Sequence, residues 1–194
     1  MMRSMNKGQI FAVLLATVSS VWPASPQEDL KKSVTAVLKI LDSKKTKKEK
    51  RILITEIYNA NFDLEKLGSN TLKSDFKNLT PEQKSEFSQK FGKFVLEFYL
   101  DKLDKYDRNK IEFVGEEIKG TRATVMTLLE YQGKMAKVNY SMAPKEDRWL
   151  VYDFEVEGVR LSSTYRSQFV KVLKEKGFEG LMSELNKLLA KYKK

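Results

Sequence analysis

The stretch from Trp149 to Phe169 changes its hydrophobic period at a glycine. Before Gly158, apolar side chains alternate along the chain, which predicts a strand with one buried face. This series is Leu150, Tyr152, Phe154 and Val156. After Gly158, apolar side chains recur at helical spacing, at Tyr165, Phe169, Val172 and Leu173. The chain must therefore leave a sheet at Gly158 and enter a helix that can fold back over that sheet.

The region before this stretch also has period two and predicts strands at residues 111–119, 122–131 and 134–142. Short turns join these strands, so they should form an antiparallel meander. If Tyr131 pairs with Lys134, one face of the sheet is largely apolar and carries Val125, Val138 and Tyr140. The fourth strand extends that face when its apolar series lies opposite Met142, Tyr140, Val138 and Ala136. A one-residue slip would bring Asp153 and Glu155 into the apolar face, so we expect this register.

Two amphipathic helices are expected before the sheet. Asp29 is expected to cap the first helix, whose apolar stripe is Leu30, Val34, Val37, Leu38 and Leu41. The second helix carries Leu53, Ile54, Ile57 and Tyr58. A charge run from Lys44 to Arg51 separates the stripes, and we interpret it as a solvated connection. Binding of anionic lipid or nucleic acid is the alternative interpretation of this run.

A third long helix begins at Thr80, where Thr80-Pro81-Glu82-Gln83 has the pattern of a capping box with proline in the first turn. Its apolar stripe is rich in phenylalanine and consists of Phe87, Phe91, Phe94, Val95 and Phe98. Two interpretations remain open for these side chains. They can fill a packed core, or as a set they can form the wall of a cavity.

Two further helices are expected after Gly158. The first begins near Ser162 or Ser163 and ends at Gly177, which suits a helix C-terminus. The second carries Leu181, Leu185, Leu188, Leu189 and Tyr192. The order of elements therefore predicts an α+β fold, with a four-stranded antiparallel sheet and helices packed on its apolar face.

The N-terminus has the features of a secretory signal peptide. Arg3 and Lys7 precede a short apolar run from Ile10 to Val18, which is followed by small residues and Pro23. We assign residues 1–24 to this signal and residues 25–194 to a single domain. An uncleaved membrane anchor is the alternative, although the apolar run is short for a membrane-spanning helix.

The composition excludes several kinds of chemistry, because the chain contains neither Cys nor His. A Cys nucleophile, a Ser-His-Asp triad and a His/Cys zinc site are therefore impossible. A secreted enzyme would depend on carboxylates such as Glu116, Glu117, Asp153 and Glu157. Glu116 and Glu117 should point to opposite faces of a strand, and Asp153 should face away from the apolar side, which disfavours an enzyme. A net charge of +10 raises nucleic-acid binding as an alternative, but Lys and Arg are dispersed among acids.

A longer motif is built on the stretch described first. It comprises Trp149, Val151-Tyr152-Asp153, Glu157-Gly158-Val159, Leu161, Tyr165 to Phe169, and Gly177 leading to Leu181. This pattern resembles the MlaC / toluene-tolerance family of periplasmic proteins, which carry phospholipid between the outer and inner membranes of diderm bacteria. Arg160 stands where the family usually has Ser, and this departure puts one local hydrogen bond of the turn in doubt.

The resemblance implies a twisted four-stranded sheet packed with helices around a deep apolar lipid pocket, without catalytic activity, cofactor or metal. It implies a soluble periplasmic carrier of phospholipid that maintains outer-membrane lipid asymmetry. The alternative is a carrier of another lipid, such as a hopanoid or sterol-like molecule. The expected partners are a phospholipid ligand, an inner-membrane ABC transporter complex and an outer-membrane lipoprotein–porin complex. We expect the pocket to be lined by Phe91, Phe94, Val95, Phe98, Val125, Val138, Tyr140, Tyr152 and Phe154.

Overall fold

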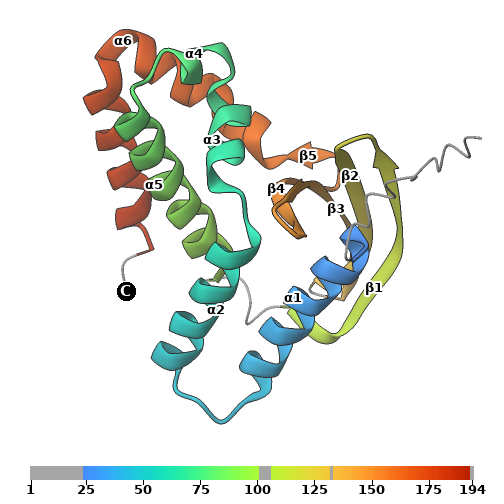
Figure 1. Ribbon diagram of the computed structural model, residues 1–194. Helices are drawn as coiled ribbons and strands as arrows, with labels where there is room; N and C mark the ends of the chain where they lie inside the picture. Colours follow the sequence, from blue (N-terminus) through green and yellow to red (C-terminus); the bar gives the residue numbers. More distant parts are fainter. Residues whose placement is uncertain (1–23, 101–105, 132, 193–194) are drawn as a thin grey trace, which may run out of the picture.

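A computed structural model describes residues 24–100, 106–131 and 133–192 of the chain (Figure 1). The assigned signal peptide lies outside the described residues except for Ala24. The helices before the sheet are α1 (Pro26–Asp42), α2 (Lys47–Asn61), α3 (Leu64–Leu72), α4 (Ser74–Lys77) and α5 (Pro81–Leu100). The strands are β1 (Tyr106–Lys119), β2 (Arg122–Tyr131), β3 (Lys134–Lys145), β4 (Arg148–Val156) and β5 (Val159–Arg160), and α6 (Leu161–Ala190) follows them. The predicted α+β class is confirmed.

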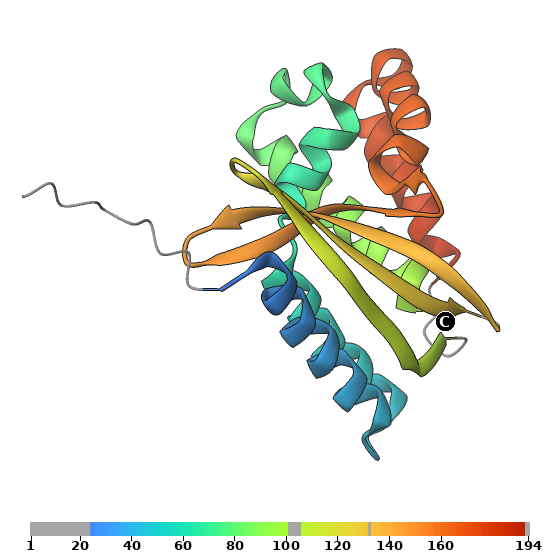
Figure 2. The ribbon, with the colours of Figure 1, turned by 90° about the vertical axis from the view of Figure 1, so that its right-hand side faces the viewer.

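The sheet is antiparallel throughout and has the order β1-β2-β3-β4-β5. The four predicted strands are present, and β5 adds a two-residue edge strand that the sequence did not predict. The predicted register of β2 and β3 is confirmed, since Tyr131 pairs with Lys134 and Val125 pairs with Tyr140. Figure 2 shows that the sheet is strongly twisted, with α1 and α2 on one side of it.

The predicted register of β4 is wrong. Tyr140 pairs with Phe154 rather than Tyr152, and the pairing shifts again between Ser141 and Met142, where Tyr152 is the extra residue of a bulge. The bulge moves Val151 onto the face that Phe154 occupies. Every residue from Trp149 to Phe154 is buried, so the alternation of apolar and polar side chains that would identify one face is lost in this strand.

Helices α1, α2 and α5 begin at capping boxes, and the predicted cap of α1 differs from the observed one. The N-cap of α1 is Ser25, whose side chain accepts from the backbone of Glu28, so the prediction of Asp29 as the cap is wrong. The predicted box at α5 is confirmed, because Gln83 N–H donates to Thr80 Oγ1 at 3.2 Å and Thr80 N–H donates to Gln83 Oε1 at 3.0 Å. The predicted break at Gly177 is also present, since this residue has φ 66° inside α6.

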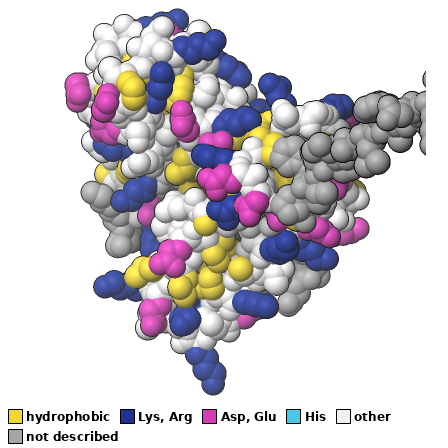
Figure 3. All heavy atoms as spheres, viewed as in Figure 1, with side chains coloured by type: hydrophobic (Ala, Val, Ile, Leu, Met, Phe, Trp, Pro, Cys, Tyr) yellow, Lys and Arg dark blue, Asp and Glu magenta, His cyan; other side chains and the backbone are white. Residues whose placement is uncertain are grey.

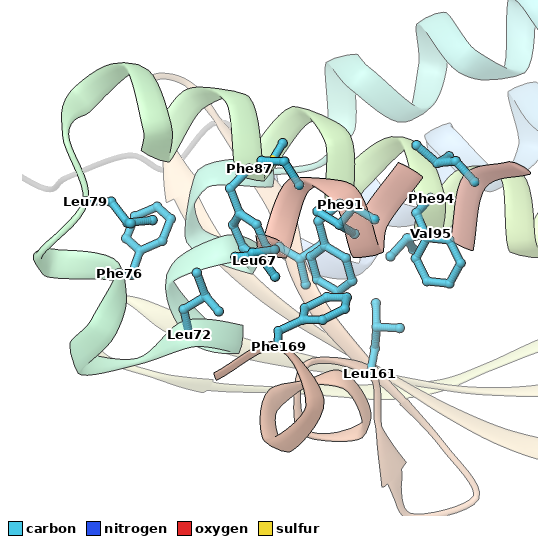
Figure 4. Packing of buried hydrophobic residues seen from close by; sticks show 14 of the residues in the cluster. Leu67, Leu72, Phe76, Leu79, Phe87, Phe91, Phe94, Val95, Leu161 and Phe169 are labelled. Atoms are coloured by element: carbon cyan, nitrogen blue, oxygen red, sulfur yellow. The ribbon is translucent and has the colours of Figure 1, made fainter. Parts of the chain in front are cut away.

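The main hydrophobic core lies between α3, α5 and α6. The phenylalanines of α5 pack against Phe169 of α6, with ring centroids 6.0 Å apart for Phe87 and 5.4 Å apart for Phe91 (Figure 4). Phe94 meets Tyr165 of α6 edge-to-face at 5.2 Å. Phe87, Phe91 and Phe169 have no measurable exposure, so this stripe belongs to a filled core.

The turn between β4 and β5 consists of Glu157 and Gly158, which both have positive φ values, of 49° and 80°. This is the backbone of a tight hairpin turn, for which glycine is suited at the second position. A Cβ atom at Gly158 would meet no neighbour within 4 Å. Substitution therefore strains the backbone without causing a clash.

Replacing Gly158 with valine is expected to lower the free energy of unfolding by about 1–2 kcal/mol, because a β-branched residue is strained at positive φ. Chemical denaturation would measure this loss. The matched variant Gly158→Asn should lose less, since asparagine tolerates this region of backbone space. Equal losses in the two variants would show that backbone strain at Gly158 is not the cause.

Candidate functional site

An apolar cavity of about 260 Å³ lies between the sheet and the hairpin formed by α1 and α2. A single enclosed water needs only roughly 10–15 Å³, so this space is much larger than a packing defect. The sheet contributes Ile111, Leu129, Val138, Tyr140, Phe154 and Val156 to the lining. Tyr140 pairs with Phe154 and Val138 with Val156, so strand register brings these side chains onto one face.

The two helices of the hairpin form the opposite wall of the cavity. α1 contributes Leu30, Val34, Val37, Leu38 and Leu41, the same series that predicted an amphipathic helix. α2 contributes Ile54, Ile57 and Tyr58. Apolar side chains gather at the surface over this hairpin, with charged side chains around them (Figure 3). The apolar stripes of α1 and α2 therefore face each other and the sheet across the cavity.

The C-terminal half of α5 forms a third wall with Val95, Leu96, Tyr99 and Leu100. Val95 also belongs to the buried cluster of the phenylalanine stripe, and Tyr99 packs against that cluster, so the cavity residues adjoin the stripe on the helix. α5 thus has one broad apolar surface, which borders the core at its phenylalanines and the cavity at Val95 and Tyr99.

The structure brings only part of the predicted pocket together. Val95, Val138, Tyr140 and Phe154 line the cavity. The other predicted residues do not line it. Phe91 and Phe94 belong to the core between α5 and α6, and Phe98 makes edge-to-face contacts with Tyr99 and Tyr192. Val125 is buried with Trp149 and Val151, and Tyr152 lies under the ammonium group of Lys66, 4.6 Å from the ring centroid.

The cavity residues of α1 and α2 are not among the residues predicted to line the pocket. Their apolar stripes predict only the buried face of an ordinary helix. One sequence feature points to these residues as a pocket wall. Both helices carry continuous apolar stripes, and the two stripes are separated by a highly charged connection, which is typical of a hairpin of helices packed by one side. Whether any lining residue contacts a lipid stays a prediction.

Hydrogen bonds tie both ends of the hairpin to the sheet. At the start of α1, Gln27 N–H donates to Glu116 Oε2 at 2.6 Å, and Trp149 N–H donates to Asp29 Oδ2 at 2.9 Å. At the end of α2, Asp63 N–H donates to Val151 O at 2.8 Å. The hairpin is therefore held over the apolar face at its base, while its tip extends away from the sheet (Figure 1).

Three of the four carboxylates considered for an enzyme accept hydrogen bonds from backbone N–H groups, and the fourth, Glu117, pairs with Lys119 at 2.7 Å. Glu116 accepts from α1, Glu157 accepts from Lys137 N–H, and Asp153 accepts from Ser162 N–H at 3.2 Å. Among the described residues, no group of Asp and Glu side chains is arranged to hold a metal ion. These acids therefore have structural roles that account for their positions.

A second, polar hollow lies outside the cavity, between α2, α5 and the end of α6. Its cations are Lys47, Lys48, Arg51, Lys90 and Lys93, and its acids are Glu86 and Glu97. Arg51 pairs with Glu97, and Lys90 lies 3.4 Å from Glu86. The three remaining lysines give this side of the molecule a positive potential.

The family model described as MlaC protein matches residues 31–187 of this chain. The chain belongs to the MlaC family.

Curated relatives agree with membership of the MlaC family. The intermembrane phospholipid transport system binding protein MlaC of Haemophilus influenzae is 25% identical over 129 residues, which are 63% of this chain and 60% of that protein. The toluene tolerance protein ttg2D of Pseudomonas putida is 27% identical over 100 residues, which are 50% of this chain and 46% of that protein. The alignments therefore span less than two thirds of either relative.

A solved structure shares the fold of this MlaC-family chain. It is the phospholipid-binding protein from Ralstonia solanacearum, in complex with a phospholipid. The TM-score is 0.75 at 21% identity, and the match covers 88% of this chain and 100% of the other. None of the helices in the described part of our chain has the length and apolar character needed to cross a membrane.

The MlaC-type motif forms the corner that joins the sheet to α6. Asp153 is buried on the side of β4 opposite Phe154 and receives hydrogen bonds from Ser162 in the first turn of α6. Arg160, the residue that departs from the family pattern, donates to Ser141 Oγ at 3.0 Å and lies 3.5 Å from Glu155. The arginine therefore makes polar contacts of its own across the sheet.

Proposed function

We propose that this chain is a periplasmic phospholipid carrier that shuttles lipid between the outer and inner membranes. The observation that carries the proposal is the apolar cavity between the sheet and the α1–α2 hairpin. Family membership supports it, because the curated relative from Haemophilus influenzae is named for intermembrane phospholipid transport. The related fold from Ralstonia solanacearum holds a phospholipid.

The chemistry of the cavity suits acyl chains. No charged side chain of the described residues lines it. Burial of each methylene contributes about 0.8 kcal/mol, so apolar contact alone supplies the driving force for holding lipid tails. A charged head group would remain near solvent, because its burial without partners would be costly. The lysines of the polar hollow would attract anionic membranes and acidic protein surfaces and would act mainly on the rate of encounter.

The same proposal includes export of the chain to the periplasm and exchange of lipid with two membrane complexes. Residues 1–24 would direct the chain to the periplasm and be removed there. In the periplasm the carrier would exchange lipid with an inner-membrane ABC transporter complex and an outer-membrane lipoprotein–porin complex. Such exchange would help to maintain outer-membrane lipid asymmetry.

The decisive experiment is lipid extraction from the full chain expressed with its own N-terminus and purified from the periplasm. Mass spectrometry should detect phospholipid bound to the protein, and the lipid-stripped protein should take up phospholipid from vesicles. Recovery of a hopanoid or sterol-like molecule in place of phospholipid would favour the alternative carrier. Absence of any bound lipid, together with no uptake from vesicles, would refute the proposal.

A further inference from the structure

One hydroxyl group stands out in the cavity wall. Tyr58 of α2 lines the cavity and is 9% exposed, and its hydroxyl oxygen is buried with no hydrogen-bond partner among the described residues. Buried polar groups are nearly always hydrogen-bonded, and leaving one unpaired costs free energy. The packing of the wall alone therefore gives no reason for tyrosine at this position.

The other short polar side chains of the lining are already satisfied by their own helices. Ser33 Oγ donates to Asp29 O at 3.0 Å, and Asn61 Nδ2 donates to Ile57 O at 2.7 Å. Tyr58 differs from both, because its hydroxyl has no partner in the described part of the chain, while its ring packs beside Phe62 at a centroid distance of 4.2 Å in a cluster with Leu41, Ile54 and Leu96. A phenylalanine would fill the same space without burying an unpaired hydroxyl.

The protonation state of the Tyr58 hydroxyl indicates which kind of ligand atom could form a hydrogen bond with it. Burial raises the pKa of Tyr58 far above its ordinary value, so the phenol keeps its proton at physiological pH. It is therefore a neutral hydrogen-bond donor in an apolar wall. A matching ligand is mainly apolar and carries an uncharged acceptor oxygen, which describes the carbonyl group of an acyl ester.

We propose that Tyr58 donates a hydrogen bond to an ester carbonyl of the bound lipid, so that the site prefers ester-linked over ether-linked chains. This inference rests on the proposed function as a lipid carrier. Neighbouring side chains cover the hydroxyl in this structure, so the contact forms as the cavity lining moves apart around the ligand. The hydrogen bond fixes how deeply the chains enter, while apolar contacts supply the affinity.

The test compares two phospholipids with the same head group and chain length, one a diacyl ester and the other a dialkyl ether. Lipid-stripped wild-type protein should take up the ester about three- to tenfold more tightly, the range expected for one hydrogen bond. Tyr58→Phe should bind the two lipids equally, with its affinity for the ether unchanged. The lipid-free variant should melt at the wild-type temperature or above it, because it loses no hydrogen bond.

The neighbouring lining residue provides a matched control. Ile57→Val removes a methylene from the cavity wall but no hydrogen-bonding group, so it should leave the ester-to-ether ratio at the wild-type value. Equal binding of the two lipids by the wild type, or an unchanged preference in Tyr58→Phe, would overturn the role of Tyr58 while leaving the carrier function intact. Failure of the wild type to bind either lipid would overturn both proposals.

Discussion

Replacing Asp153 with alanine is expected to lower the free energy of unfolding by about 3 kcal/mol. The carboxylate is only 1% exposed and accepts from Phe154 N–H at 3.0 Å, Ser162 N–H at 3.2 Å and Ser162 Oγ–H at 2.6 Å. It also places a negative charge at the N-terminus of α6, where the helix dipole favours it. Alanine would leave these buried donors without an acceptor. Chemical denaturation of the lipid-free protein would measure the loss.

A neighbouring acid on the same strand serves as the control for this variant. Asp153 and Glu155 both approach Arg160, at 3.7 and 3.5 Å, but the side chain of Glu155 is 25% exposed, whereas that of Asp153 is buried against the first turn of α6. Glu155→Ala should therefore cost at most about 1 kcal/mol. If Asp153→Ala were no more destabilising than Glu155→Ala, the carboxylate of Asp153 would not be what holds α6 to the sheet.

Sequence periodicity predicted the fold best where each strand has one buried and one polar face. The register of β2 and β3 was correct because an apolar face with Val125 and Tyr140 alternates with a mixed face. The same reasoning failed in β4, where both faces are buried and a bulge at Tyr152 reverses the alternation. A bulge depends on contacts from other elements, and hydrophobic spacing within the strand does not record them.

The candidate site was predictable only in part for a related reason. The phenylalanine stripe of α5 is the most prominent apolar feature, yet α6 covers its phenylalanines, and the cavity faces Val95 of that stripe and Tyr99 beside it. Spacing shows which residues share a helix face but not which neighbouring element covers that face. Hydrogen bonds between α1 and the sheet hold the hairpin over the cavity, and spacing within α1 and α2 does not predict these bonds.

Filling the cavity tests whether its volume holds the ligand. Val138 lies on the cavity face of β3, and Val138→Trp would place a bulky ring in the space assigned to acyl chains. We expect a folded protein, because the ring can enter the cavity. Overpacking around the ring should weaken the binding free energy of the lipid by about 1–3 kcal/mol. That cost corresponds to an affinity weaker by roughly five- to 150-fold. Vesicle uptake followed by quantitative lipid extraction would measure it.

The same substitution on the other face of β3 separates lost volume from general damage to the strand. Met135 is 49% exposed and pairs with Glu130 on the face opposite the cavity. Met135→Trp should therefore keep the wild-type affinity for phospholipid. Thermal melting of both variants would show whether each remains folded. A folded Val138→Trp protein that carries as much phospholipid as Met135→Trp would mean that the acyl chains lie elsewhere, and the cavity under the α1–α2 hairpin would lose its assignment.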